Sequence, residues 1–325
     1  MKIGIVSTSR IIDVFWAALP EMENIEVSAI CCRPQSEAKA RAWSQQYHIP
    51  AVYTDYDKFL AEADFDLLYD GTVNSMHYPD ALRAVQAGRG VIMEKPFTIT
   101  AEQCAELIRL AQEKNVWLFE AITTLHSPCF RFMRELVPQL GPLRGGNMQF
   151  SMMPPRYAPY RKRLALSTTF DPKLAGGCLL DMNVYNLHLA IGLLGAPDGA
   201  VYYPNRGWNG IDTSGLAVLQ YPDFTMACYA AKDSAGPCGM FLQGEYGYLQ
   251  LTTPPNTCAK ALAVIRGETR TFENPPTHRF AIEFNSIRTI WEAQDRAAHD
   301  ALLAQSQAVM NTIAPLYQTV LEKCL

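Results

Sequence analysis

Up to Ala121 the chain alternates short apolar runs with longer segments in which apolar residues have a helical spacing. This alternation indicates βαβ units, in which helices cover both faces of a parallel sheet. It predicts an α/β fold with an N-terminal Rossmann domain built on a doubly wound parallel sheet. The expected strands are 2–6, 25–32, 65–69, 91–93 and 116–119. The expected helices are 11–19, 36–47, 78–87 and 101–114.

Beyond residue 121 strand-like runs follow one another directly. Tyr221-Pro222-Asp223-Phe224 and Gly244-Glu245-Tyr246-Gly247 are typical hairpin turns. The prediction is a Rossmann dinucleotide-binding domain over 1–121 and an α+β domain over 122–325. The second domain is expected to have a mostly antiparallel sheet with one open face, from strands at 143–153, 213–221, 224–231, 239–243 and 246–251. A long helix is expected at about 291–322, with Pro315 interrupting it.

Length and composition exclude several classes of function. At 325 residues the chain is long enough for two domains, each with its own core. A net charge of −4 gives no basic field for nucleic acid or an anionic membrane. No apolar run approaches the ~20 residues that span a bilayer. Nine cysteines without a Cys-x-x-Cys pair predict no metal site and fit a reducing cytoplasm.

The principal candidate for chemistry lies in the stretch Gly90-Val91-Ile92-Met93-Glu94-Lys95-Pro96. This stretch predicts a buried strand that ends in a carboxylate, an amine and a proline. Open parallel sheets bind ligands beyond the carboxyl ends of their strands, where Lys95 would lie. The alternative is a surface lysine in a loop that precedes the next helix.

The turn after the first strand is where the phosphates of a dinucleotide are expected. A G-x-G-x-x-G pattern would let the backbone approach the pyrophosphate, but Ser7, Ser9 and Ile12 occupy those positions. Either the serine hydroxyls bind phosphate at the helix N-terminus, or this unit has lost its nucleotide. The candidate cofactor residues of the turn are Ser7, Thr8, Ser9, Arg10 and Ile11.

Two further loops at the same edge of the sheet are candidates for cofactor binding. After the second strand, Arg33 could bind a ribose 2′-phosphate, and no acid for the ribose hydroxyls follows until Glu37. This favours NADP, with NAD possible, whereas a solvated loop arginine is the alternative. After the third strand, Thr72 and Asn74 suit contact with a cofactor, although this loop also suits a helix cap.

In the second half, Asp181, Tyr185 and His188 are spaced at i, i+4 and i+7, so on a helix they share one face. Leucines form an apolar stripe beside them, which predicts a helix that lines a pocket. A packing tyrosine and a core histidine are the alternatives for Tyr185 and His188. Arg156 and Tyr157, in a loop after a strand, are candidates for contact with substrate hydroxyls or phosphate.

Several of these motifs resemble those of the Gfo/Idh/MocA family, which includes glucose–fructose oxidoreductase and inositol dehydrogenase. Glu94-Lys95-Pro96 is similar to the family signature, and the loop 72–78 is similar to T-P-N-x-x-H-x, with Val73 in place of proline. Residues 176–185 resemble G-G-x-L-x-D-x-G-x-[HY], with Asn183 in place of glycine. The Glu120-Ala121 pair is similar to the residues at the end of the sixth strand in the branch of dihydrodiol and xylose dehydrogenases.

The resemblance implies hydride transfer between a nicotinamide and a carbinol carbon of a sugar-like or diol substrate. Lys95 would stabilise the oxyanion, Tyr185 would be the acid/base, and Asp181 would orient the substrate or hold Lys95. The implied cofactor contacts add Thr72, Asn74, His77, Glu94 and Lys95, and the implied substrate contacts are Lys95, Arg156, Tyr157, Asp181, Tyr185 and His188. The second domain would bind substrate and form a homodimer or homotetramer through its open face. A dinucleotide-binding regulator and a redox-assisted glycosidase are the alternative functions.

Overall fold

The computed structural model describes residues 1–324 and divides into two compact units. Unit 1 comprises Met1–Ala121 and Thr277–Ser306, and unit 2 comprises Ile122–Pro276 and the chain from Gln307 onward. The expected division into 1–121 and 122–325 does not include the return of the chain to unit 1. This return has a physical cause, because Phe280 and Phe284 are buried in the core of unit 1. A hydrophobic pattern shows that a helix has a buried face, but not which domain buries it.

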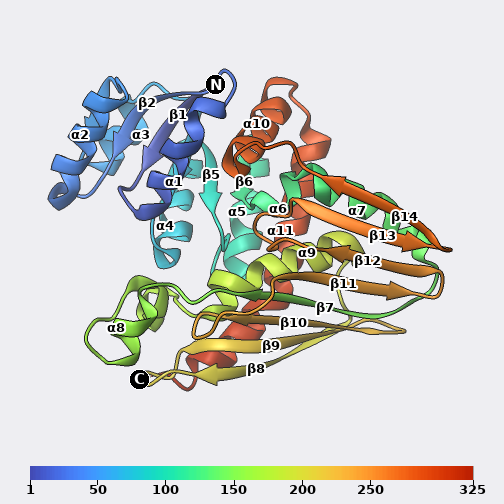
Figure 1. Cartoon of the computed structure of the whole chain (residues 1–325). Coiled ribbons are helices and arrows are strands. Elements are labelled where there is room, and N and C mark those ends of the chain that lie inside the picture. Colours follow the sequence, from blue (N-terminus) through green and yellow to red (C-terminus); the bar gives the residue numbers. More distant parts are fainter. Residues whose placement is uncertain (325) are drawn as a thin grey trace. The chain divides into compact units, whose positions relative to one another are not determined.

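Unit 1 contains a six-stranded parallel sheet in the order β3-β2-β1-β4-β5-β6 (Figure 1). Its strands are β1 (Lys2–Val6), β2 (Glu26–Cys31), β3 (Ala51–Tyr53), β4 (Leu67–Asp70), β5 (Gly90–Glu94) and β6 (Leu118–Ala121). The predicted doubly wound Rossmann sheet is confirmed. The strand order reverses between β1 and β4, which is where such sheets form a ligand-binding crevice. The prediction missed β3, because three residues are too few for a periodic signal.

Helices pack on both faces of this sheet. They are α1 (Arg10–Ala18), α2 (Glu37–Gln46), α3 (Tyr56–Glu62), α4 (Asn74–Gln86), α5 (Ala101–Glu113) and α10 (Arg279–Glu292). On one face the ring of Phe15 in α1 lies 5.4 Å from Tyr69 of β4 and 5.0 Å from Phe284 of α10. On the other, α4 packs against β5 and α5. The helix predicted at 78–87 begins earlier, so Pro79 lies inside α4.

Unit 2 contains an eight-stranded sheet in the order β14-β13-β12-β11-β7-β10-β9-β8. Its strands are β7 (Leu143–Ser151), β8 (Gly199–Arg206), β9 (Asp212–Gln220), β10 (Thr225–Ala231), β11 (Gly239–Gly244), β12 (Gly247–Leu251), β13 (Lys260–Ile265) and β14 (Glu268–Glu273). Among the described strands of this second sheet, only β7 and β10 pair in parallel, so the prediction of a mostly antiparallel sheet is confirmed. β8, β13 and β14 lie outside the predicted strands.

One face of this sheet packs against α7 and α9, and the other is its open face. The helices of unit 2 are α6 (Thr123–His126), α7 (Pro128–Leu136), α8 (Tyr157–Arg161) and α9 (Val184–Leu194), and a π-helical turn, Leu179–Asn183, precedes α9. The open face carries half-buried apolar side chains from neighbouring strands, namely Leu216, Val218, Ala227, Tyr229, Phe241, Tyr248, Leu262 and Val264.

The end of the chain differs from the prediction of one helix at about 291–322. Helix α10 ends at Glu292, and α11 (Arg296–Leu321) follows after a short break. The expected interruption at Pro315 was wrong, because α11 continues through it. A proline removes one backbone donor from a helix, and the remaining hydrogen bonds can carry the helix past it. Among the described residues, Pro172–Leu194 is apolar enough for a membrane span by length and composition, but 83% of its apolar 18-residue core is buried inside the structure.

Candidate functional site

The carboxyl edge of the sheet in unit 1 brings together the first set of predicted site residues. Lys95 is half-buried, whereas every other residue from Gly90 to Thr98 is buried. Helix α1 starts at this edge, and the side chain of its N-cap residue, Ser9, caps none of its backbone N–H groups. An anion can therefore satisfy the first N–H groups of the helix. A Cβ at Gly71 would lie 2.6 Å from Ile12 Cδ1, so only glycine allows α1 to pack this closely.

The serine turn is held by its own side chains. Ser7 has a φ of +110°, which is a conformation that favours glycine. Its Oγ accepts a hydrogen bond from Ser9 N at 3.0 Å, and Ser9 Oγ donates to Gly71 O at 2.6 Å. The hydroxyl proton of Ser9 is thus used inside the protein. Lys39 of α2 donates to Thr8 O at 3.1 Å, which adds a cation that the prediction missed. Arg10 is exposed and begins α1, with Ile11 next to it.

The loop after β4 is tied to the segment that carries Lys95. His77 is 1% exposed, and its Nδ1 lies 2.8 Å from Pro96 O while its Nε2 lies 3.4 Å from Thr72 O. Burial lowers the pKa of His77, so the ring is neutral and Nδ1 donates to Pro96 O. Asn74 begins α4 beside it. His77 was predicted as a cofactor contact, but this geometry makes it a brace between two loops of the site.

Three glutamates are buried in unit 1, and two of them hold the same segment. Glu94 accepts a hydrogen bond from the Tyr69 hydroxyl at 2.6 Å, and Glu120 accepts one from Phe97 N at 3.0 Å. Glu283 of α10 is fully buried, and neither of its carboxyl oxygens has a hydrogen-bond partner among the described residues. Burial is the main cause that raises the pKa of Glu283 well above its usual range, and the negative charge of Glu94 is the second cause. A protonated carboxyl group therefore fits this position.

In unit 2 the Gly176–Gly177 pair leads into the π-helical turn. Gly177 has a φ of +112°, and a Cβ there would collide with the Asp212 carboxylate. Its glycine is thus required by local packing, independently of any ligand. Asp181 lies inside the turn, and its Oδ2 is 2.7 Å from the ammonium nitrogen of Lys232. Lys232 was not predicted, because a lysine at the end of a strand carries no local signal of burial.

Tyr185 and His188 lie in α9, after the π-helical turn. The sequence predicted that Asp181 shares one helical face with these two residues. The π-helical turn breaks the α-helical spacing, so Asp181 does not lie on a regular face with them. Tyr185 is 8% exposed, and its ring meets Phe150 edge-on at 5.8 Å. His188 is fully buried in the core of the unit. The prediction of substrate contact for His188 conflicts with this burial, whereas Tyr185 retains a small exposed area.

The segment around α8 carries the last two predicted substrate residues. Arg156 is the N-cap residue of α8 and is exposed, and Tyr157 is half-buried. The ring of Tyr157 lies 6.0 Å from Phe170, which itself stacks on Tyr160 at 4.4 Å. The segment is therefore anchored by aromatic packing, with its basic side chain on the outside.

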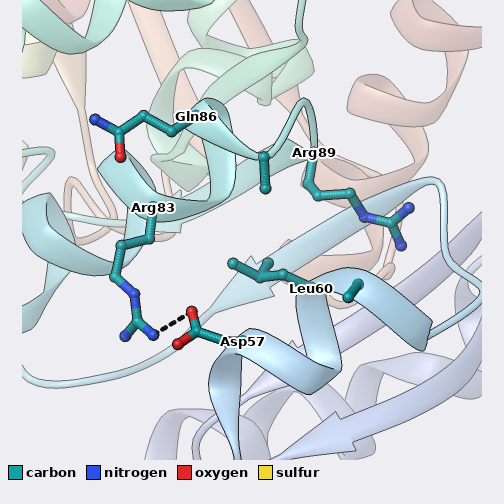
Figure 2. A pocket seen from close by; sticks show the side chains of 7 residues that line it. Asp57, Leu60, Arg83, Gln86 and Arg89 are labelled. Carbon is teal, nitrogen blue, oxygen red and sulfur yellow. Dashed lines mark hydrogen bonds and ion pairs between the residues drawn. The ribbon is translucent and has the colours of Figure 1, made fainter.

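Unit 1 also has a cavity between α3 and α4 (Figure 2). It measures about 580 Å³ and is lined by Asp57, Leu60, Ala61, Arg83, Gln86, Ala87 and Arg89. Arg83 forms an ion pair with Asp57 at 2.5 Å, and Arg89 donates to Ala63 O at 2.5 Å. Both guanidinium groups are thus used within the protein, and no predicted site residue lines this cavity.

The geometry of unit 1 agrees with comparisons to known families. Residues 1–122 match the model of GFO_IDH_MocA, an oxidoreductase family with an NAD-binding Rossmann fold. The match confirms the predicted resemblance to the Gfo/Idh/MocA family over the N-terminal domain of this chain. The chain is an NAD(P)-dependent oxidoreductase, and the predictions of fold and enzyme class are confirmed.

Known enzymes match along most of the chain. The NADP(+)-dependent scyllo-inositol 2-dehydrogenase of Bacillus subtilis is 26% identical over 78% of this chain and 76% of its own length. The human trans-1,2-dihydrobenzene-1,2-diol dehydrogenase is 26% identical over 90% of this chain and 86% of its own. Among solved structures, an aldose-aldose oxidoreductase from Caulobacter crescentus, in complex with glycerol, has a TM-score of 0.79 at 19% identity over 99% of this chain and 98% of that one. A 3-ketoreductase from Actinomadura kijaniata, in complex with NADP and TDP-benzene, has a TM-score of 0.78 at 24% identity over 98% and 97%.

The serine turn gives a first prediction for this oxidoreductase. Replacing Ser7 by glycine should raise the unfolding midpoint, because it removes a strained φ worth about 1–3 kcal/mol against one hydrogen bond of about 1 kcal/mol. It should also tighten NADP binding about fivefold, or ~1 kcal/mol, because Ser9 N and the space taken by the Ser7 side chain become available to phosphate. Thermal unfolding and calorimetric titration measure the two effects.

A matched control for this prediction is Asn24→Gly, which removes another positive φ, +50°, in the same unit. Asparagine tolerates that conformation, so the control should change neither stability nor NADP binding by more than a small amount. Weaker NADP binding by Ser7→Gly would show that the serine hydroxyl binds the phosphate directly.

The buried glutamates give a prediction about pH. Folding raises the pKa of Glu283, so its contribution to stability is present below the unfolded value, near 4.5, and is lost as the pH rises through the folded value. Glu283→Gln has no proton to lose, so at about pH 8 it should be more stable than wild type. Burial raises the pKa of Asp70 to about 7 as well, so both proteins retain some pH dependence.

Denaturant unfolding of both proteins at about pH 5 and pH 8 tests the Glu283 prediction. The difference between them should grow from the lower to the higher pH. A difference that is the same at both pH values would mean that Glu283 is already ionised throughout this range.

Proposed function

We propose that this oxidoreductase transfers hydride between NADP and a carbinol or carbonyl carbon of a sugar-like or polyol substrate. The observation that carries the proposal is Lys95, a half-buried lysine that follows β5 at the carboxyl edge of the sheet. When bound, the nicotinamide donates or accepts the hydride. The ammonium group of Lys95 stabilises negative charge on the reacting oxygen. The names of relatives that act on inositol, a dihydrodiol and aldoses support this class of substrate.

Each proposed catalytic residue has one task. Lys95 stabilises the oxyanion, and Asp181 orients a substrate hydroxyl. In the oxidation direction the hydroxyl proton of the substrate would pass to the phenolate form of Tyr185, and in reduction the Tyr185 phenol would donate that proton to the substrate oxygen. Arg156 and Tyr157 are proposed to contact the rest of the substrate. His188 lies in the core and is not part of the proposed site.

The turn between β1 and α1 fits the pyrophosphate, and the end of β2 fits NADP. Arg33 is exposed directly after β2, and Lys39 lies near the turn through its bond to Thr8 O. Glu37, the nearest following acid, forms an ion pair with Arg41 at 2.6 Å, which reduces its capacity to bind ribose hydroxyls. Two relatives support this choice, since one is named as NADP(+)-dependent and one is seen in complex with NADP.

Arg33→Ala should therefore weaken NADP binding about tenfold, or ~1.4 kcal/mol, while NAD binding stays unchanged. Calorimetric titration with both dinucleotides measures this. Arg109→Ala is the control, because Arg109 forms an exposed ion pair with Glu113 on α5, and its loss should affect neither affinity. Equal weakening for both dinucleotides would assign Arg33 to a part of the cofactor that NAD and NADP share.

The proposed reaction is tested with a panel of polyols and sugars. The panel contains scyllo-inositol, myo-inositol, glucose, xylose, glycerol and trans-1,2-cyclohexanediol, each with NADP and with NAD. Nicotinamide absorbance should change with NADP for at least one of them. If NADP binds but no member reacts, the protein fits a dinucleotide-binding regulator instead. If a glycoside is cleaved with no net change in nicotinamide, the redox-assisted glycosidase alternative holds.

We also propose that the protein is a homodimer or homotetramer in the cytoplasm. The open face of unit 2 supports an oligomer, because its apolar side chains, such as Tyr229 and Phe241, are half-buried in the single chain and a second copy would cover them. Light scattering after gel filtration measures the mass in solution, and a monomer would refute the proposal. The nine cysteines form no disulfide in the described structure, which fits a reducing compartment.

A further inference from the structure

Lys232 is a buried lysine whose charge is directed at Asp181. It follows Ala231, the last residue of β10, and is 1% exposed. Its ammonium nitrogen lies 2.7 Å from Asp181 Oδ2 and 2.7 Å from Thr169 O. The same nitrogen lies 4.5 Å from the centre of the Phe170 ring. An ammonium group has three N–H donors, and these three neighbours account for all of them.

Two other acids near Lys232 have their own partners. Asp212 accepts hydrogen bonds from a backbone N–H of the π-helical turn at 2.6 Å and from the Tyr202 hydroxyl at 2.7 Å. Asp233 accepts hydrogen bonds from two hydroxyl groups of β9, each at 2.8 Å. Of these three carboxylates, Asp181 is the one to which Lys232 donates a hydrogen bond, and the Lys232 charge acts on Asp212 without such a bond.

We infer that Lys232 is a positioning residue that holds the Asp181 carboxylate ionised and in one orientation, so that Asp181 accepts a hydrogen bond from a neutral substrate hydroxyl. This rests on the proposed function. Lys232 is too buried to reach a substrate, whereas the side chain of Asp181 is 27% exposed. An ionised carboxylate accepts hydrogen bonds and repels anions, so this position selects a hydroxyl over a phosphate or carboxylate.

Lys232 also connects Asp181 to the α8 segment. Thr169 and Phe170 belong to the chain that follows α8, and Phe170 stacks on Tyr160 of α8 at 4.4 Å with an interplanar angle of 13°. The lysine thus fixes the position of Asp181 relative to the segment that carries Tyr157. A carboxylate displaced by about 1 Å from a productive position can cost about 10²-fold in rate.

A double-mutant cycle tests this role with wild type, Lys232→Met, Asp181→Asn and the combined variant. If Lys232 acts through Asp181, Lys232→Met should lower kcat/KM by about 10²-fold in the wild-type background and by less than about twofold in the Asp181→Asn background. The assay uses NADP and the panel member that wild type turns over. Lys260→Met, which removes an exposed lysine paired with Glu273 at 3.0 Å, is the control and should change nothing.

The same four proteins can also be compared by their thermal unfolding midpoints, and this measurement needs no substrate. The combined variant should unfold at a higher temperature than Lys232→Met, because the single variant leaves the carboxylate without its ammonium partner. If Lys232→Met does not fold, Lys232→Gln takes its place in both cycles. If wild type reacts and the activity losses are additive, the inference fails while the proposed function stands. If no panel member reacts, the proposed function fails, and additive midpoints would then overturn the inference separately.

Discussion

Replacing Lys95 by methionine should lower kcat/KM by about 10³-fold, the upper range for loss of one group that stabilises an oxyanion. Methionine keeps the unbranched stem and removes the charge. The residues on either side of Lys95 are buried and bonded to other parts of unit 1, such as Glu94 to Tyr69 and Pro96 O to His77. The backbone should therefore stay in place, and the loss should appear in kcat with little change in NADP affinity. Steady-state kinetics and calorimetric titration measure the two.

The control for Lys95→Met is Lys114→Met, which removes an exposed lysine at the end of α5 in the same unit. Its turnover should equal that of wild type. Turnover by Lys95→Met within a few-fold of wild type would refute the assignment of the oxyanion role. A loss of NADP binding that accounts for the whole rate loss would instead make Lys95 a cofactor contact.

Much of unit 1 could be predicted because its signals are local. β1 and β5 are uninterrupted apolar runs, and the helices between strands have regular apolar spacing, so these elements were found within a few residues of their bounds. β3 and α3 are too short to show a period. Helix α10 lies outside the predicted helix at 291–322 except for its last two residues, so the helix itself was missed. Its place in unit 1 depends on contacts across nearly the whole chain, such as the 2.7 Å hydrogen bond from His278 N to Glu21.

The candidate site could be predicted where the position of a residue follows from a strand end, as for Lys95. It could not be predicted where geometry comes from distant contacts. Lys232 and Asp181 are 51 residues apart, and nothing in either local sequence indicates that they pair. The positive φ of Ser7 could not be predicted from the sequence, because serine rarely adopts this conformation. For His77, the motif suggested a cofactor contact, and only the packing reveals its bond to Pro96 O.

Tyr185→Phe should lower kcat by about 10²–10⁴-fold, the usual contribution of a general acid/base. The substitution removes one hydroxyl and keeps the ring, so the edge-on contact with Phe150 at 5.8 Å and 83° is retained. Two hydrogen bonds hold the start of α9 to β10, from Asn183 Nδ2 to Cys228 O at 2.9 Å and from Asn186 Nδ2 to Tyr229 O at 3.0 Å, and both are also retained. The unfolding midpoint should therefore change little.

The rate loss in Tyr185→Phe should fall on proton transfer and leave substrate binding nearly unchanged, so KM should vary by less than about threefold, well under the energy of one hydrogen bond. Its rate should also lose the pH dependence that a titrating acid or base imparts. Tyr203→Phe, which removes an exposed hydroxyl on β8, is the matched control and should behave as wild type. If Tyr185→Phe instead raised KM and left kcat unchanged, Tyr185 would bind the substrate in its ground state, and the proton would have to pass to another group.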